Sequence, residues 1–329
     1  SLPNNIGMKK NIIFLLISIL AYACGNKKDL LPNSGGKPGE VIVVIEKQVW
    51  NGEVGDALKN SLMQDYPALP QDEPTFSLYP VPLENFNDIF QSNRNIIKIS
   101  FNPNSDSTFI RKTNDRWAKP QLIIELVAKD IKAMTKLIQL NGNKIKELIL
   151  SEERTRLKQV YTKFREKSLI TPIHKFGIDL IIPNGYKLNL DTTNFIWISS
   201  ETPYMSQGIF VYSIPYNDTS IFNTTKILAI RDSVLKKYIP GPLQGTYMTT
   251  EYNYPPSEKR FELNGNFIYE IRGLWRVEND FMGGPFVNFA TVVKNNKLVC
   301  AEGYVYAPKD DKKPFVWQME AILYSLTHL

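Results

Sequence analysis

Residues 260–277 read RFELNGNFIYEIRGLWRV, and this stretch decides how the C-terminal part of the chain folds. Asn264-Gly265 stands between two runs that are rich in aromatic and β-branched residues, and Asn-Gly at such a position favours a two-residue hairpin turn. After the turn, apolar and charged residues alternate with a period of two, which is typical of a strand with one buried face. The stretch therefore predicts an antiparallel hairpin.

The second strand of this hairpin, 266–277, divides its residue types between two faces. One face is predicted to carry Phe267, Tyr269, Ile271, Trp275 and Val277, and the opposite face Glu270, Arg272, Arg276 and Glu278. We expect the apolar face to pack on the next helix in the sequence, 315–326, because short connections favour adjacent elements. The four charged residues would then form cross-strand pairs at the surface.

Downstream of the hairpin, the sequence predicts more antiparallel sheet and a closing helix. Segments 286–293 and 298–306 form a second predicted hairpin around Asn295-Asn296. Asp310-Asp311 is expected to cap the final helix, with Pro314 in its first turn.

Upstream segments repeat a similar coarse order of strands followed by a helix. The first half has predicted strands at 41–45, 75–81, 95–101 and 121–127, then a long helical segment at 130–164 that Asn141-Gly142-Asn143 breaks or kinks. The second half has strands at 175–183, 195–199 and 208–214, then an amphipathic helix at 225–238. We therefore predict an α+β fold with mixed or antiparallel sheets packed on helices, an N-terminal half at 41–168 and a C-terminal half at 169–329.

An N-terminal stretch, MKKNIIFLLISILAYAC at 8–24, predicts where the protein resides. Two lysines precede an apolar run that is shorter than the about 20 residues needed to cross a bilayer as a helix. A positive start, a short apolar core and a small residue before the cleavage point are typical of a secretory signal. Residues 1–23 are therefore expected to comprise upstream residues and a signal peptide.

Cys24 directly follows the small residue Ala23, and this arrangement resembles a bacterial lipobox. A cysteine thiolate is the nucleophile that accepts a lipid, and two or three acyl chains hold a protein stably at a membrane. The alternative is an ordinary signal peptide with a chance cysteine. Residues 24–40, which are polar and contain Gly, Pro and Ser, are predicted to form a flexible lipid-anchored tether.

The composition is that of a globular protein, with 329 residues, 43% of them hydrophobic, and a net charge of +6. The positive charges are spread along the chain, which argues against nucleic-acid binding. Cys24 and Cys300 are the only cysteines, so lipidation of Cys24 leaves no disulfide to form. His174 and His328 are the only histidines, and the sequence offers no metal-ligand cluster, phosphate loop or catalytic-triad motif. No metal or cofactor is expected.

Four motifs in the C-terminal half carry a family resemblance. They are Gly273-Leu274-Trp275, Asp280-Phe281-Met282-Gly283-Gly284-Pro285-Phe286, Gly303-Tyr304-Val305-Tyr306-Ala307-Pro308 and Gln318-Met319-Glu320-Ala321-Ile322-Leu323. As a set they resemble a family of Bacteroidota-type lipoproteins with a domain of unknown function, of the DUF4837 kind. The resemblance implies a cell-envelope location and transfers no activity.

One loop stands out as a candidate surface for a partner or ligand. Two glycines, Gly283 and Gly284, permit positive φ, and the following proline fixes the exit into the next strand. Trp275, Met282 and Phe286 are expected beside them. The alternative is a tight strand connection that packs under a neighbouring element.

Three functions remain open from the sequence. The first is a non-catalytic binding or assembly module, lipid-anchored at the outer membrane on an undetermined face, that contacts another envelope protein. The second is an envelope hydrolase that uses carboxylates such as Asp280 and Glu302, which requires the pair to lie within about 10 Å of each other. The third is a carrier of a small apolar ligand between the two halves.

Overall fold

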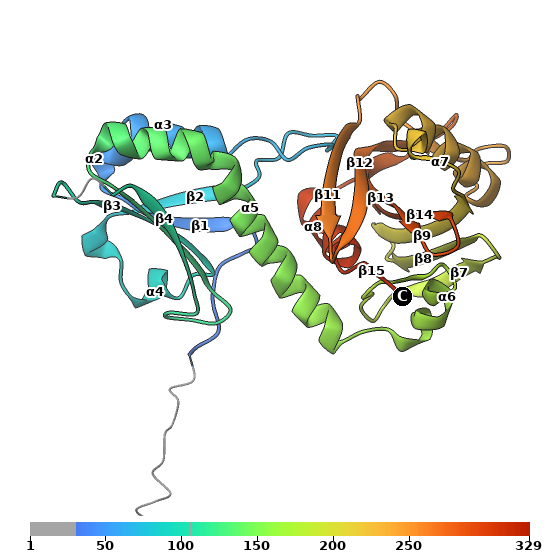
Figure 1. The fold of residues 1–329 in the computed structure, drawn as a ribbon, viewed down its shortest axis with the longest axis horizontal. Helices are drawn as coiled ribbons and strands as arrows, with labels where there is room; N and C mark the ends of the chain where they lie inside the picture. Colours follow the sequence, from blue (N-terminus) through green and yellow to red (C-terminus); the bar gives the residue numbers. More distant parts are fainter. Residues whose placement is uncertain (1–30, 105–106) are drawn as a thin grey trace, which may run out of the picture.

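The computed structural model describes residues 31–104 and 107–329, so the predicted signal peptide and Cys24 lie outside the described residues. Figure 1 shows two sheet-containing parts joined by the long helix α5, Ile131–Lys163. Within the described residues, none of the helices combines the length and the apolar character needed to cross a membrane. The two larger sheets differ in kind, since one is mostly parallel and the other antiparallel, and helices pack on both. This arrangement confirms the α+β fold class.

The first half contains a five-stranded sheet of order β2-β1-β3-β5-β4. Its strands are β1 Glu40–Val44, β2 Ser77–Val81, β3 Asn95–Phe101, β4 Phe109–Asn114 and β5 Leu122–Ala128. All neighbours are parallel except β4 and β5. Pro80 lies in the edge strand β2, where its missing N–H costs no ladder bond. Helices α2 Lys47–Trp50, α3 Glu53–Leu62 and α4 Asp88–Gln91 and the 3-10 turn η1 Leu83–Asn85 connect the strands.

Helix α5 is continuous through the predicted break, and the structure agrees with the alternative of one kinked helix. The residues Asn141-Gly142-Asn143 are all helical, and the helix bends as it passes from α3 to the second half (Figure 1). A Cβ on Gly142 would lie 2.5 Å from Ser61 Oγ on α3. Glycine is thus needed at this position for the close approach of two helices, and it does not end the helix.

The second half contains an eight-stranded antiparallel sheet, so the similar order of elements in the two halves does not extend to their topology. Its strands are β7 Lys187–Asp191, β8 Phe195–Glu201, β9 Ser206–Pro215, β10 Met248–Thr250, β11 Ser257–Leu263, β12 Asn266–Val277, β13 Gly283–Val293 and β14 Lys297–Tyr306. The order is β10-β12-β13-β14-β9-β8-β7, with β11 also paired to β12. Asn264 and Gly265 have φ of 51° and 78°, as the predicted hairpin turn requires.

Two helices cover opposite faces of this sheet. Helix α7, Thr224–Tyr238, closes a core with residues such as Phe210, Tyr269 and Trp275. Helix α8, Lys313–Leu323, covers the other face, and this second core continues without interruption into the first half. Short elements α6 Ile170–His174, β6 Ile178–Asp179 and β15 Thr327–His328 complete the fold, with 3-10 turns η2 Lys167–Leu169 and η3 Thr219–Ile221.

The apolar face of β12 packs on a different helix from the one that was predicted. Tyr269, Ile271, Trp275 and Val277 share a buried face, but this face packs under α7 and not on the C-terminal helix. Phe267, which was expected in the same core, is 46% exposed. Period-two alternation identifies which residues share a face, but it does not identify the helix that covers them.

The opposite face of β12 is also buried, which contradicts the expected surface pairs. Glu270 is 3% exposed and Arg272 8%, because α8 and α5 cover them. Arg272 donates from Nε to Glu270 at 2.6 Å and from Nη1 to Glu320 of α8 at 2.5 Å. Tyr66 of the first half also donates to Glu320, so this ion cluster joins the two halves. Arg276 remains partly exposed and pairs with Glu278.

The expected cap of helix α8 is corrected by a contact between segments that are far apart in the sequence. Helix α8 is not capped by Asp310 or Asp311, since the carboxylate of Glu73 accepts from the backbone N–H groups of Lys312 at 2.7 Å and Lys313 at 3.0 Å. A carboxylate at a helix N-terminus satisfies N–H groups that have no partner in the helix.

The predicted flexible tether is shorter than expected. Ser34 N–H donates to the carbonyl of Lys119 at 3.1 Å, and Gly35 N–H donates to that of Ser92 at 2.8 Å. Residues 32–35 therefore belong to the folded body, and β1 begins at Glu40.

Candidate functional site

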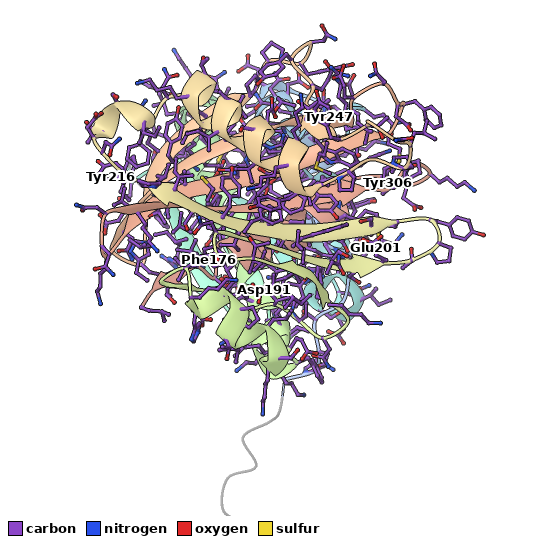
Figure 2. The ribbon with its side chains drawn as sticks, turned by 90° about the vertical axis from the view of Figure 1, so that its right-hand side faces the viewer. Phe176, Asp191, Glu201, Tyr216, Tyr247 and Tyr306 are labelled. Carbon is purple, nitrogen blue, oxygen red and sulfur yellow. The ribbon has the colours of Figure 1, made fainter. Side chains whose placement is uncertain are left out.

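A groove of about 600 Å³ opens at one end of the eight-stranded sheet, between the strand ends and the C-terminal end of α7. Most of its lining is aromatic or aliphatic. The principal lining residues are Trp197, Tyr204, Met205, Ile239, Pro240, Pro242, Met248, Trp275, Met282, Tyr304 and Tyr306. We call this the aromatic groove. Figure 2 shows Glu201, Tyr247 and Tyr306 toward this end of the sheet and Tyr216 at the other end.

Neighbouring strands place the aromatic rings of the groove. Trp197 on β8 donates from Nε1 to the hydroxyl of Tyr304 on β14 at 3.1 Å. The Tyr304 ring stacks on Phe210 with centroids 4.8 Å apart and meets the Trp275 ring edge-on at 5.9 Å. Burial raises the pKa of Tyr304 to about 12, so the hydroxyl stays neutral and serves as a hydrogen-bonding group. The floor of the groove is thus aromatic, and ring contacts and a hydrogen bond between neutral groups hold its side chains together.

Helix α7 stops before it reaches the strand ends that line the groove. Helix α7 ends at Tyr238, and Pro240 and Pro242 prevent its continuation over the strand ends. A Cβ on Gly241 would lie 2.3 Å from Thr246 Oγ1, so the loop folds tightly back on itself. The strand ends beyond α7 therefore remain uncovered.

Three loops surround the groove, and each exposes a large apolar side chain. Tyr204 in the β8–β9 loop is 65% exposed, Leu243 in the α7–β10 loop 61%, and Phe281 in the β12–β13 turn 98%. Tyr204, Pro242 and Met282 line the same cavity, so the three loops are neighbours. Exposed apolar side chains on three loops around one apolar cavity make this end of the sheet a candidate interaction site.

The predicted candidate surface lies partly in this groove. Trp275 and Met282 line it, although Trp275 is only 2% exposed and donates from Nε1 to the carbonyl of Val305 at 3.2 Å. Phe286 points into the core, 1% exposed, with the guanidinium of Arg231 3.9 Å above its ring.

Gly283 and Gly284 were predicted to permit a positive φ, and this reason for glycine at the two positions was wrong. Neither Gly283 nor Gly284 is among the glycines with positive φ, because both lie in β13. A Cβ on Gly284 would instead lie 2.0 Å from the carbonyl oxygen of Val305, and one on Gly283 would lie 2.8 Å from that of Trp275. Both glycines are therefore required by close backbone contact.

The sequence reasoning missed most of the groove. Tyr304 and Tyr306 were present in the Gly303–Pro308 motif, and their period-two spacing could have placed both on one face of β14. Trp197 and Tyr204 gave no signal, since only the sheet order brings the β8–β9 hairpin beside β14.

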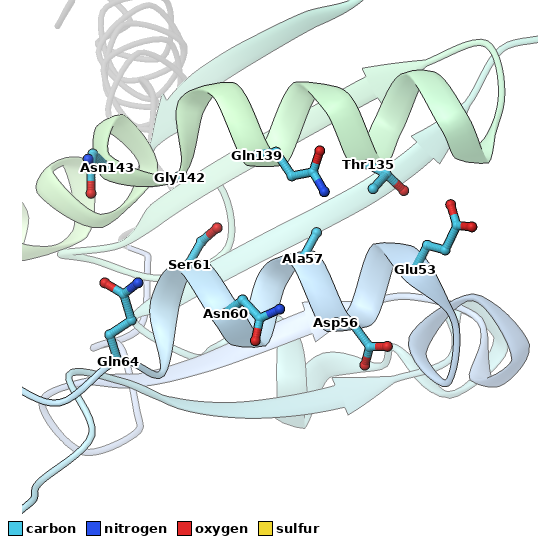
Figure 3. A pocket seen from close by; sticks show the side chains of 10 residues that line it. All are labelled: Glu53, Asp56, Ala57, Asn60, Ser61, Gln64, Thr135, Gln139, Gly142 and Asn143. Atoms are coloured by element: carbon cyan, nitrogen blue, oxygen red, sulfur yellow. The ribbon is translucent and has the colours of Figure 1, made fainter.

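Other cavities have a different character. A groove of about 520 Å³ between α3 and α5 is lined mainly by amide, hydroxyl and carboxylate groups. Figure 3 shows Ser61 and Gln139 pointing toward the facing helix, while Asp56 and Asn60 point away from it. No set of charged groups converges there, so it is a solvated groove between helices. A cleft of about 270 Å³ lies between the two halves, and its lining includes charged residues such as Lys146, Glu147 and Arg154, so this cleft is not the apolar pocket considered for a carrier.

The carboxylates considered for hydrolysis are not brought together. Glu302 is fully buried and bound by Arg231, with Nε–O distances of 2.8 and 3.0 Å. Glu302 pairs in register with Asn288, while Asp280 precedes Gly283 at the start of β13. Asn288 lies five residues along β13 from Gly283, about 17 Å at about 3.4 Å per residue, and Asp280 lies in the turn before Gly283, so the register does not bring the two acids into a pair.

The two histidines have different hydrogen-bond partners. His174 Nε2 is 2.9 Å from Asp179 Oδ1, and His328 Nε2 is 3.1 Å from Thr291 Oγ1. Over the described ranges, His, Cys, Asp and Glu side chains form no group of three that could hold a metal ion.

Comparison with known families assigns most of the chain. Residues 165–325 match the model described as "Domain of unknown function (DUF4837)". We refer to the matched residues 165–325 as the DUF4837 domain. The resemblance seen in the sequence motifs is thereby confirmed for the family. Residues 34–162 match a second model, "Domain of unknown function (DUF8532)".

The DUF4837 domain carries the aromatic groove, since every lining residue falls within 165–325. No curated protein is significantly similar to the chain. Among solved structures, the solution structure of cyanobacterial PsbP (CyanoP) from Synechocystis sp. PCC 6803 is similar at 13% identity and a TM-score of 0.34, over 47% of this chain and 88% of that one.

Proposed function

We propose that this chain is a non-catalytic binding module of the cell envelope, held at the outer membrane by lipid on Cys24. Its binding site is the aromatic groove of the DUF4837 domain, which takes an apolar segment of a neighbouring envelope protein. The observation that carries the proposal is the three-loop rim, where Tyr204, Leu243 and Phe281 expose apolar side chains around an aromatic groove. Aromatic and methionine side chains are enriched at the centres of protein interfaces.

The position of the groove supports a protein partner. Figures 1 and 2 share a vertical axis, and the first described residues lie at the bottom of Figure 1. Glu201 and Tyr306 lie at the side of the molecule in Figure 2. A body anchored from its N-terminal end would therefore present the groove sideways, toward a neighbour on the same membrane.

A carrier of a small apolar ligand is the second candidate. A volume of about 600 Å³ lies within the range of small-molecule sites. The rim argues for the larger partner, because Leu243 and Phe281 extend the apolar surface beyond the lining of the cavity. Native mass spectrometry of protein extracted from membranes distinguishes the two, since a carrier would show a bound small molecule of constant mass.

Site-specific cross-linking tests the partner proposal. A photoreactive phenylalanine analogue in place of Phe281 should capture a partner of reproducible mass on intact cells, because that side chain contributes little to folding at 98% exposure. The matched control is the same analogue in place of Leu140 of α5, which is 73% exposed in the first half. Capture from both positions, or from neither, would contradict the assignment of the groove.

A further inference from the structure

We infer that the apolar side chains of the segment 83–91 form a contact surface for the lipid bilayer. We call this the α4 surface, defined by Leu83 of η1 and Ile89 of α4. The inference rests on the proposed lipid anchor at Cys24 and is independent of what the aromatic groove binds.

The α4 surface exposes aliphatic residues although its aromatic neighbours are packed. Leu83 is 62% exposed and Ile89 78%. Phe86 and Phe90 turn inward, where they pack on the small core of β1, β3 and β5, and Phe86 meets the Trp117 ring at 5.5 Å. The segment thus has an inner aromatic side and an outer aliphatic side that no described residue covers.

The chain enters the folded body beside this surface. Gly35 N–H donates to the carbonyl of Ser92, the residue that ends α4, and Arg94 N–H donates back to the carbonyl of Gly35 at 2.9 Å. On the other side, Lys119 N–H donates to the carbonyl of Pro32 at 2.8 Å. Figure 1 shows α4 and the first described residues together at the lower end of the first half.

The linking segment keeps the α4 surface within a short distance of a membrane. Leu31 follows Cys24 by seven residues. Seven residues span at most about 25 Å when fully extended and about 15 Å as a flexible coil. The predicted sixteen-residue tether would have had a longer reach, so the bonding of residues 32–35 to the body is what brings this surface to the lipid.

The charges around the surface point to apolar contact more than to electrostatic attraction. Glu84 and Asp88 are exposed on the same segment, and Arg116 and Lys119 are exposed on the neighbouring β4–β5 loop, 53% and 70% by side chain. With both signs present, attraction to anionic headgroups is weak, whereas aliphatic side chains gain by leaving water. The contact should therefore change little with salt.

A quenching experiment on the full lipidated chain tests the inference. Ile89→Cys and Leu140→Cys variants are labelled with an environment-sensitive fluorophore and reconstituted in phosphatidylethanolamine and phosphatidylglycerol vesicles that contain doxyl-labelled acyl chains. Cys300 is 1% exposed, and Cys24 carries the lipid in the proposal, so neither takes the label. Leu140 is the matched control, since it is 73% exposed on the helix that packs with α3.

The expected result is quenching at position 89 that exceeds quenching at position 140 at least several-fold and that persists at high salt. Equal quenching at the two positions, or none at position 89, would overturn the inference. A chain that takes up no labelled palmitate and does not float with vesicles would overturn it together with the anchor. Cross-linking from position 281 would still report on the aromatic groove by itself, so the two proposals fail separately.

Discussion

Glu320→Gln tests whether the buried ion cluster holds the two halves together. Glu320 is 0% exposed and receives the Tyr66 hydroxyl from the first half and Arg272 Nη1 from β12. Arg154 of α5 lies 3.6 Å from its second oxygen. Glutamine keeps the size of the side chain, removes its charge and presents an amide to two guanidinium groups.

The structure sets the expected magnitude. Removal of one partner of a buried ion pair costs about 3–5 kcal/mol, because the other charge stays buried without compensation. Arg272 keeps Glu270, at 2.6 and 3.2 Å, so the cost should fall at the lower end, about 3 kcal/mol. Tyr66→Phe removes the hydrogen bond that the hydroxyl donates to Glu320 and the one that it accepts from Arg272 Nη1 at 3.1 Å, and should cost at least about 1.5–3 kcal/mol.

The cost should also depend on pH. Burial by itself raises the pKa of Glu320, but the charges of Arg272 and Arg154 outweigh it and leave the pKa below its ordinary value. A carboxyl with a depressed pKa in the folded state contributes stability that is present above the unfolded-state pKa and is lost as the pH falls through the folded one. The difference between wild type and Glu320→Gln should therefore be largest near neutral pH and shrink in acid.

Urea unfolding followed by tryptophan fluorescence measures these effects. Trp317 is a suitable reporter because its ring centroid lies 6.0 Å from that of Tyr66. Glu262→Gln is the matched control, since Glu262 is exposed on β11 and its replacement should cost under about 1 kcal/mol. A double-mutant cycle of Glu320→Gln with Tyr66→Phe should give a coupling energy of about 0.5–3 kcal/mol. A Glu320→Gln variant within about 1 kcal/mol of wild type at neutral pH would refute the reasoning.

Three further predictions concern the DUF4837 domain. Gly284→Ala should lower the free energy of unfolding by more than about 1 kcal/mol, because the added Cβ would lie 2.0 Å from the carbonyl oxygen of Val305. An unchanged midpoint in urea unfolding would contradict this prediction and show that the strands separate easily. Trp275→Ala should cost about 3–5 kcal/mol and Arg276→Ala under about 1 kcal/mol, since Trp275 is 2% exposed and Arg276 38% by side chain; equal costs in urea unfolding would contradict the observed burial. Burial raises the pKa of Cys300 to about 12, so its thiol should react with iodoacetamide at pH 8 only after unfolding, and rapid alkylation of the native protein would argue against this core.

Local patterns in the sequence were sufficient for the single elements. The Asn264-Gly265 turn, the Asn295-Asn296 turn and the edge position of β2 follow from backbone preferences that act over a few residues. The alternation in β12 correctly grouped Tyr269 with Trp275 on one buried face. These features depend on neighbours along the chain, so the sequence contains the information directly.

The helices that bury each face of β12 could not be predicted from these local patterns. The charges of Glu270 and Arg272 indicated a solvated face, yet α8 and α5 bury them because Glu320 and Tyr66 arrive from segments far away in the sequence. A charged side chain is buried only when partners compensate it, and such partners are set by tertiary packing. Period and polarity alone therefore gave the wrong environment for this face.

Some residues of the candidate site could be found from the sequence, and the others only from the tertiary structure. The sequence by itself determined that Trp275 and Met282 stand close to Gly283 and Gly284, because they are close along the chain. Only the tertiary structure decided that Trp197, Tyr204 and Tyr306 join them, since the sheet order places the β8–β9 hairpin beside β14. The physical reason is that strand pairing joins residues that are about 100 positions apart through backbone hydrogen bonds, which are common to all residue types and leave no side-chain pattern to read.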